Sequence, residues 1–545
     1  ANLGRLLVDI RRPDQALAPL ELAVRLRPDW PAVRGTLGNA LAALGRIAEA
    51  RSCLEAAAAQ AADDPDILSN LGTVLQEQGA IEAALARYRR ALALDPEHAD
   101  AHYNFATALA AIGRPTEAEA SFERALALDP DNTVAHSALI FVLDADPAST
   151  PARRSAERRA WAERFAQPLA AAIAPHANAR DPERRLRIGY VAASFHRHSA
   201  AFLYGPVIRN HDKERFETVC YSASQFEDRI TAELRAAAGQ WREAYRLDDA
   251  ELAAQIRADG IDILVDLSGH DAGNRLLTFA RKPAPVQISA WGYVSGTGLA
   301  AMDYLLIDRW FIPAAARADY AERLIDLPSA FCYQPPPDAP EVAARPSDGP
   351  PVLGSLNRLA KVSDQALELW SRVLARLPEA RLFLKDKTLG EAADRDALAE
   401  RLRTFGIDPA RAILRGGSSQ RDHLAAYGEI DFALDPVPQG GGVTTLEGLW
   451  MGVPVVTQAV ENLTGRASTA ILSALGLTDW IADSAEAYVE LAVAKCRDRA
   501  ALTDLRTRLR PLLAGSVIGD AGAYTRAVEA TYRDLWRRWC AGGKT

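Results

Sequence analysis

The sequence predicts an array of helical repeats followed by two α/β units, each built on a parallel sheet. Three observations carry this prediction: a repeated step of 34 residues near the amino terminus, short apolar strands that alternate with helices after residue 183, and a Pro-rich stretch at 334–350 between two such regions. The chain has 545 residues, of which 49% are hydrophobic and 25% charged, as in folded globular proteins.

Residues 1–130 repeat the same small residues at the fixed step of 34. The recurring positions are Gly4, Gly38 and Gly72, the alanines Ala16, Ala50, Ala84 and Ala118, and the turn glycines Gly45, Gly79 and Gly113. This pattern is that of tetratricopeptide repeats, whose small residues let two helices cross closely and whose stacking leaves a concave face. That face usually holds extended peptide, so protein acceptors are the expected partners. The asparagines of the inner helices are either peptide contacts or ordinary polar surface residues: Asn39, Asn70 and Asn104.

The rest of the chain divides into four predicted segments: a helical connector at 131–182, α/β units at 183–335 and 350–518, and a final helix at 519–545. The connector could begin with one more inner repeat helix, and the final amphipathic helix is expected to pack onto the first α/β unit. Strands are expected at 186–193, 218–222, 261–267, 286–290, 304–307, 352–356, 382–385, 412–414, 432–434, 455–456 and 480–481. Two doubly wound units that face each other across a cleft are the GT-B architecture of glycosyltransferases.

Residues 431–457 have the pattern of strand, glycine loop, helix and strand. Gly440, Gly441 and Gly442 allow close backbone approach, and Thr444 and Thr445 stand where a helix N-cap belongs. Free N–H groups at the positive end of a helix bind anions, which favours a phosphate site over an ordinary tight turn. The stretch is neither a Walker A loop nor a dinucleotide fingerprint.

Polar residues also follow two strands of the first α/β unit, where ligands of such sheets bind. His196 and His198 follow the strand at 186–193, and His270 follows the strand at 261–267. The two histidines at 196 and 198 could bind a metal ion, but no third ligand is evident nearby, so no metal is expected.

Composition excludes several other classes. The net charge of −8 argues against nucleic acid as the main partner. Five cysteines without CxxC spacing fit a reducing compartment, and no apolar run is long enough to span a membrane, so a cytoplasmic protein is expected.

With these pieces in place, the chain resembles the protein O-GlcNAc transferase family, including its plant SPINDLY-like branch. The resemblance covers nearly the whole chain and is most specific at 283–298, 354–361 and 441–447. Family members transfer one sugar from a nucleotide sugar to Ser or Thr of proteins, with inversion and without a bound metal. The resemblance therefore implies UDP-GlcNAc as the donor and no further cofactor.

The resemblance also implies roles for individual residues. Lys361 matches the family lysine that holds the diphosphate, and a lysine there can neutralise the leaving group. Contacts to the phosphates, ribose or base are implied for Arg358, which stands where animal members have Gln, and for His423, Gly441, Gly442, Thr444, Thr445 and Glu447. The sugar or acceptor side is implied for His196, His270 and Tyr293.

The identity of the general base stays open at the level of the sequence. His198 matches the family histidine once proposed to take the proton of the acceptor hydroxyl. The competing view gives that proton to the donor's own phosphate or to an acid that matches Asp259, and His198 then only shapes the sugar pocket.

Two alternative functions remain. Val443 stands where animal members have His, and the sequence around Lys361 and Glu447 leans toward the plant branch, part of which uses GDP-fucose. A protein O-fucosyltransferase is therefore one alternative. A peptide-binding scaffold with an inactive transferase half is the other, although Lys361, Thr444 and Glu447 are all retained.

Overall fold

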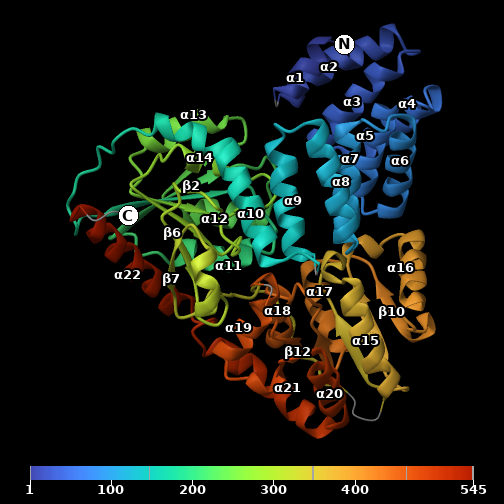
Figure 1. The fold of residues 1–545 in the computed structure, drawn as a ribbon, viewed down its shortest axis with the longest axis vertical. Coiled ribbons are helices and arrows are strands. Elements are labelled where there is room, and N and C mark those ends of the chain that lie inside the picture. The colour runs from blue at the N-terminus through green and yellow to red at the C-terminus, as the bar shows by residue number, and fades with distance from the viewer. Residues whose placement is uncertain (1, 11, 147, 346–348, 462, 543–545) are drawn as a thin grey trace. The chain divides into compact units, whose positions relative to one another are not determined.

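The computed structural model describes residues 2–10, 12–146, 148–345, 349–461 and 463–542 (Figure 1). Residue 147 of the predicted connector, residues 346–348 of the predicted linker and residues 543–545 of the predicted final helix lie outside the described residues. The chain forms two compact units, each described by itself. One consists of Ala1–Val142, Arg358–Asp364 and Lys385–Gly417, and the other of Leu143–Asn357, Gln365–Leu384 and Ser418–Thr545.

The first unit begins with the predicted repeats, each a pair of antiparallel helices. They are α1 (Asn2–Asp9), α2 (Pro13–Leu26), α3 (Pro31–Ala43), α4 (Ile47–Gln60), α5 (Pro65–Glu77), α6 (Ile81–Leu94), α7 (Ala99–Ala111) and α8 (Pro115–Leu128). A Cβ atom at Gly38 would lie 2.6 Å from Leu54 Cγ, so the close crossing of α3 and α4 requires glycine. The small residues at the 34-residue step therefore act as the sequence predicts.

The first unit also contains segments that are distant from the repeats in sequence. They are the short 3-10 turn Leu359–Lys361, the helix α16 (Ala392–Thr404) and the strand β10 (Ala412–Arg415). The helix α16 lies against α6, because Asp394 Oδ1 accepts a hydrogen bond from the Glu82 backbone N–H at 3.0 Å. The predicted second α/β unit thus shares part of its chain with the compact unit of the repeats.

The first sheet has seven parallel strands in the order β3-β2-β1-β4-β5-β6-β7. They are β1 (Leu186–Ala192), β2 (Phe216–Ser222), β3 (Gln240–Glu243), β4 (Ile263–Asp266), β5 (Val286–Ala290), β6 (Tyr304–Ile307) and β7 (Arg323–Asp326). The order reverses beside β1, as in doubly wound sheets, whose ligands bind at the carboxyl ends of the strands. Five strands are predicted from the sequence, and the two edge strands, β3 and β7, are not.

The second sheet has the six strands that the sequence predicts, in the order β10-β9-β8-β11-β12-β13. Besides β10 they are β8 (Val352–Ser355), β9 (Arg381–Lys385), β11 (Phe432–Leu434), β12 (Val455–Gln458) and β13 (Ile481–Ala482). The central strand β11 pairs in parallel with β8 on one side and β12 on the other. Its carboxyl end therefore opens at the middle of the sheet.

Helices connect the strands of both sheets (Figure 1). Those of the first sheet are α11 (Ala201–Asn210), α12 (Arg229–Ala237), α13 (Asp249–Ala258) and α14 (Leu276–Ala280). Those of the second are α15 (Asp364–Arg376), α17 (Gln420–Ala426), α18 (Val443–Trp450), α19 (Ala467–Ala474), α20 (Ala485–Arg497) and α21 (Arg499–Ala514).

The final helix α22 (Ala521–Cys540) returns to the first sheet, as the sequence predicts. Trp291 Nε1 donates a hydrogen bond to Tyr524 Oη at 2.9 Å, and His211 Nδ1 lies 2.9 Å from Glu529 Oε1. These buried contacts join the end of the chain to the sheet that begins at residue 186.

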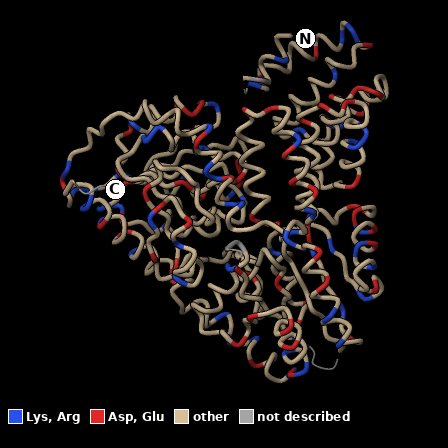
Figure 2. Tube along the Cα trace, viewed as in Figure 1, with Lys and Arg blue, Asp and Glu red and all other residues tan. Residues whose placement is uncertain are grey.

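The connector is helical, with α9 (Thr133–Ala145) where one more inner helix is predicted and then α10 (Pro151–Trp161). Acidic and basic residues are interspersed along the trace, in keeping with the small net charge of −8 (Figure 2). Within the described residues, no helix combines the length and the apolar character needed to cross a bilayer.

Candidate functional site

The glycine loop after β11 is folded around a buried carboxylate. Asp435 is 1% exposed; its Oδ1 accepts a hydrogen bond from Gly441 N at 2.6 Å and its Oδ2 accepts one from Thr457 Oγ1 at 2.7 Å. A Cβ atom at Gly441 would lie 2.5 Å from Thr445 Oγ1, and one at Gly440 would lie 2.7 Å from Asp435 Oδ2. The loop therefore needs these glycines to fold back onto the start of α18.

The N-cap of α18 differs from the sequence prediction. It is Gly442, and Thr444 and Thr445 are the second and third residues of the helix. Neither hydroxyl caps the helix, because Thr444 Oγ1 donates to Asn357 Oδ1 at 2.7 Å and Thr445 Oγ1 lies 2.6 Å from Ser468 Oγ. No side chain among the described residues caps this helix start. The sequence predicts an anion site at this positive helix end.

One turn further along α18, Glu447 meets α17. Glu447 is 5% exposed, and its two carboxylate oxygens lie 3.3 Å from His423 Nε2 and 3.4 Å from Gln420 Nε2, respectively. The His423 ring packs edge-on against Tyr427 with centroids 5.9 Å apart, and Tyr427 Oη donates to Thr444 O at 2.9 Å. The structure therefore brings together the predicted ribose and base residues beside the phosphate loop.

Gln420 and Tyr427 are functional candidates that sequence reasoning missed. Tyr427 lies four residues after His423, which puts both on one face of the helical segment. This spacing could have indicated that Tyr427 lies beside His423. An aromatic residue at helical spacing is more often a core residue, however, and Tyr427 is also buried.

The loop after β1 carries His196 and His198, both half-buried, with ring centroids 6.1 Å apart. His198 Nδ1 accepts a hydrogen bond from Ala200 N at 3.3 Å. Between them, Arg197 donates from its backbone to Asp228 Oδ2 at 2.7 Å and from its guanidinium to Ser418 O at 3.4 Å, just before α17. The histidine loop is thus linked to the segment that carries His423.

His270 and Tyr293 lie together but point into a buried network. His270 is 1% exposed, its Nε2 lies 2.9 Å from Thr297 O, and its ring centroid is 6.0 Å from that of Tyr293. Tyr293 Oη donates to Asp144 of α9, which Arg158 of α10 also contacts at 2.5 Å. Burial raises the pKa of the Tyr293 hydroxyl. The connector helices therefore hold these two side chains in place.

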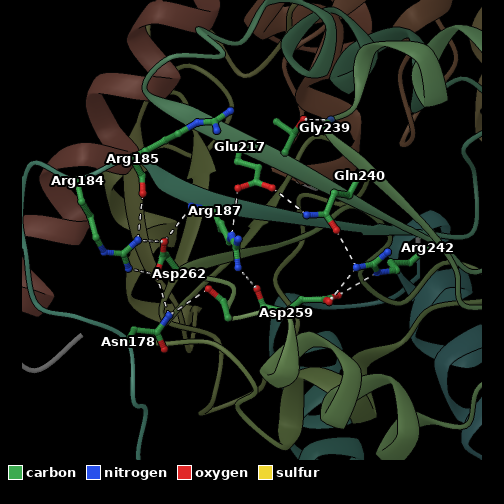
Figure 3. A network of polar contacts seen from close by, with 12 residues as sticks. Asn178, Arg184, Arg185, Arg187, Glu217, Gly239, Gln240, Arg242, Asp259 and Asp262 are labelled. Carbon is green, nitrogen blue, oxygen red and sulfur yellow. Dashed lines mark hydrogen bonds and ion pairs between the residues drawn. The ribbon is translucent and has the colours of Figure 1, made fainter.

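Asp259 lies elsewhere. It follows α13 and precedes β4, and so stands at the amino ends of the strands, whereas His198 follows the carboxyl end of β1. Its carboxylate accepts hydrogen bonds from Tyr221, Arg242 and Gln255 in a polar network that includes Arg187, Asp262 and Glu217 (Figure 3). Burial raises the pKa of Asp259, but the contacts with Arg242 and Tyr221 outweigh it and leave that pKa lowered. A carboxylate so stabilised is a poor proton acceptor.

Arg358 and Lys361 belong to the compact unit of the repeats. Arg358 is exposed and precedes the 3-10 turn, and Lys361 is half-buried at the end of that turn. Lys361 N donates to Arg358 O at 2.9 Å, and Leu359 N donates to Asp386 Oδ2 at 3.2 Å. The backbone that leads into the predicted phosphate-binding lysine is therefore fixed.

A cavity of about 590 Å³ lies within the second unit. Its lining comes from the connector and from both predicted α/β regions, 183–335 and 350–518. The lining residues include Arg158, Ser295, Gly296, Glu322, Val460 and Arg466. Arg466 spans the two domains by donating to Trp310 O and Phe311 O, both at 3.0 Å. The cavity offers donors and acceptors from both domains, which suits a polar chain such as a peptide. Among the described residues, no three His, Cys, Asp or Glu side chains form a group that could hold a metal ion.

Comparisons with known proteins place this geometry in context. The pattern of glycosyl transferase family 41 matches residues 162–334 and 345–528, more than half of the chain, and tetratricopeptide repeat patterns match residues 31–97 and 69–133. A solved mutant of the O-GlcNAc transferase of Thermobaculum terrenum is 37% identical, has a TM-score of 0.89, and is matched over 94% of this chain and 98% of its own.

Two curated proteins illustrate the sequence relationship. SPINDLY of Petunia hybrida, a probable UDP-N-acetylglucosamine–peptide N-acetylglucosaminyltransferase, is 35% identical over 377 residues, which are 67% of this chain and 40% of its own. The UDP-N-acetylglucosamine–peptide N-acetylglucosaminyltransferase of Caenorhabditis elegans is 23% identical over 479 residues, with 66% of this chain and 41% of its own covered. The chain thus spans about two fifths of the length of these curated relatives.

Proposed function

Because this chain belongs to glycosyl transferase family 41, we propose that it is an inverting transferase that moves one N-acetylglucosamine from UDP-GlcNAc to Ser or Thr hydroxyls of proteins. The observation that carries the proposal is the start of α18, where an uncapped helix end lies one turn from the Glu447–His423 pair. That arrangement suits a nucleoside diphosphate: phosphates at the helix start, ribose on Glu447 and base near His423.

In the proposed reaction, the acceptor oxygen forms a bond to the anomeric carbon while the bond from that carbon to the diphosphate breaks. Lys361 and the N–H groups of α18 would neutralise the negative charge that develops on the leaving diphosphate. The proton of the acceptor hydroxyl has to go to a base that faces the sugar. The repeats would present the acceptor protein, and the cavity beside Arg466 would bind part of a polar chain.

The hydrogen bond at His198 supports the donor phosphate as that base. A neutral imidazole has one nitrogen that accepts and one that donates. Nδ1 accepts a hydrogen bond from Ala200 N, and we infer that the neutral form of His198 carries its proton on Nε2 and is therefore not the base. The donor's own phosphate is then the proposed acceptor of the hydroxyl proton, and His198 orients the sugar.

Transfer assays with radiolabelled UDP-GlcNAc and GDP-fucose, each with a mixture of acceptor proteins, test the proposal. We expect label from UDP-GlcNAc in protein, and we expect Lys361→Ala to reduce it roughly 10²-fold or more, about 3 kcal/mol in the transition state. Transfer from GDP-fucose alone would favour the fucosyltransferase alternative. Transfer from neither donor would favour the scaffold alternative. Activity of Lys361→Ala near that of the wild type would show that the phosphate site is wrongly assigned.

A further inference from the structure

The turn that carries Lys361 is held from one side by the end of strand β9. Asp386 Oδ2 accepts a hydrogen bond from Leu359 N at 3.2 Å, and Oδ1 accepts from Thr388 N at 2.8 Å and Thr388 Oγ1 at 2.6 Å. Asp386 is 9% exposed, so these contacts are shielded from water. This side of the turn is therefore fixed within the predicted nucleotide-binding region itself.

The other side of the same turn rests on the repeat array. Gly113, in the turn between α7 and α8, has a φ of +74°. A Cβ atom there would lie 2.6 Å from both Leu359 O and Val362 O, the carbonyl groups that flank Lys361. Any side chain at Gly113 would push this backbone away, so the array and the Lys361 turn fit against each other without space to spare.

Arg401 of α16 joins these two pieces through one guanidinium group. It donates to Ile112 O at 2.9 Å and to Gly113 O at 3.3 Å on the array, and to Val362 O at 2.9 Å on the far side of Lys361. Asp364 Oδ1, 2.6 Å away, orients the guanidinium. Ile112 is the C-cap of α7, where backbone carbonyls are left unsatisfied and a cation is favoured.

The same helix makes a second contact with the array that does not touch the Lys361 turn. Asp394 accepts from the backbone of Glu82 at the start of α6, whose own N-cap, Ala80, offers no side chain for the purpose. Removing Asp394 would loosen the array without removing a contact of the turn. Variants of Asp394 and Arg401 therefore distinguish the attachment of the array from the support of Lys361.

We propose that Arg401 is a positioning residue for Lys361, and that it acts by clamping the Ile112–Gly113 turn of the array against the backbone around the lysine. The repeat array would then take part in turnover of the donor as well as in presentation of the acceptor. This inference rests on the proposed function, since it gives Lys361 its role at the leaving diphosphate.

A double-mutant cycle on the full chain tests the inference. Hydrolysis of UDP-GlcNAc and of GDP-fucose without acceptor protein is measured for wild type, Arg401→Ala, Lys361→Ala and the double variant. We expect Arg401→Ala to lower kcat about tenfold with KM changed less than about threefold, because Lys361 acts mainly on the transition state. In the Lys361→Ala background the same change should cost less than about twofold, since nothing is left for Arg401 to position.

Matched variants guard against a loss of folding. Arg403→Ala, on the same helix with a side chain 59% exposed, and Asp394→Asn should both keep kcat within about twofold of wild type. Arg401→Lys retains the charge but not the geometry, and is expected to fold and to lose part of the rate. An equal loss from Arg401→Ala in both backgrounds, or no loss in either, overturns the inference and leaves the proposed function standing. If Lys361→Ala itself has no effect, both fail together.

Discussion

At the scale of single residues, His198 shows how one backbone contact restricts the chemistry of a side chain. The N–H of Ala200 donates to Nδ1, which favours the neutral tautomer with its proton on Nε2. The sequence alone left His198, the donor phosphate and Asp259 as possible bases, because no spacing rule reports a tautomer. The position of Asp259 among Tyr221, Arg242 and Gln255 likewise depends on long-range folding.

The pH dependence of turnover separates these roles. We expect His198→Ala to weaken donor binding and to lower turnover, while the shape of the pH–rate profile stays that of the wild type. If His198 were the base, the pH–rate profile would rise near pH ~6.5, the ordinary pKa of an imidazole. That rise would be absent in His198→Ala. Loss of such a rise in His198→Ala would contradict the orienting role. Asp259→Asn, measured in parallel, should reduce stability and leave the profile unchanged.

At the scale of elements, the loop between β11 and α18 requires glycine, because a side chain there would collide with neighbouring groups. Its glycines lie against Asp435 and the two threonines that follow them. Sequence reasoning recognised the loop and the helix but placed the N-cap at the threonines, because Ser and Thr are preferred there. In the structure their hydroxyls are taken by Asn357 and Ser468, which come from distant segments that a local pattern does not include.

Gly441→Ala tests this loop. A methyl group 2.5 Å from Thr445 Oγ1 and 2.9 Å from Thr444 Oγ1 must shift the start of α18. We expect the affinity for UDP, measured by calorimetry, to fall about tenfold or more, with a modest loss of thermal stability. Gly349→Ala is the control, because a Cβ atom there meets nothing within 4 Å. Unchanged affinity of the Gly441 variant would mean that the phosphates bind elsewhere.

The two strands that sequence reasoning missed share a physical reason. β3 and β7 are the edges of the first sheet, and their side chains are half-buried or exposed. A buried parallel strand is a continuous apolar run, whereas an edge strand such as Gln240–Glu243 carries polar residues and has no such pattern. All six strands of the second sheet could be predicted, as could the repeats, because both are defined by spacing and apolar runs within the local sequence.

At the scale of the whole molecule, the positive groups assigned to the diphosphate are provided by the protein. They are the N–H groups at the start of α18 and Lys361. We therefore expect UDP to raise the melting temperature without added Mg²⁺ or Mn²⁺. At a hundredfold excess over Kd, the gain in the free energy of unfolding should be about 2.7 kcal/mol. EDTA should not change the shift in differential scanning fluorimetry. A shift that disappears with EDTA would contradict a metal-free site and direct attention back to His196 and His198.

The contacts of α16 with α6 and α7 also limit how the repeat array can change in length. Asp394 binds the start of α6, and Arg401 binds the end of α7. The helix α16 therefore contacts two particular repeats. A 34-residue unit grafted ahead of α5 would leave both contacts in place. The same unit inserted after α8 would leave them too but would separate α8 from α9, and one inserted between α6 and α7 would break the register. We therefore expect the array to accept additional repeats ahead of α5, but not between α6 and α7 or between α8 and α9.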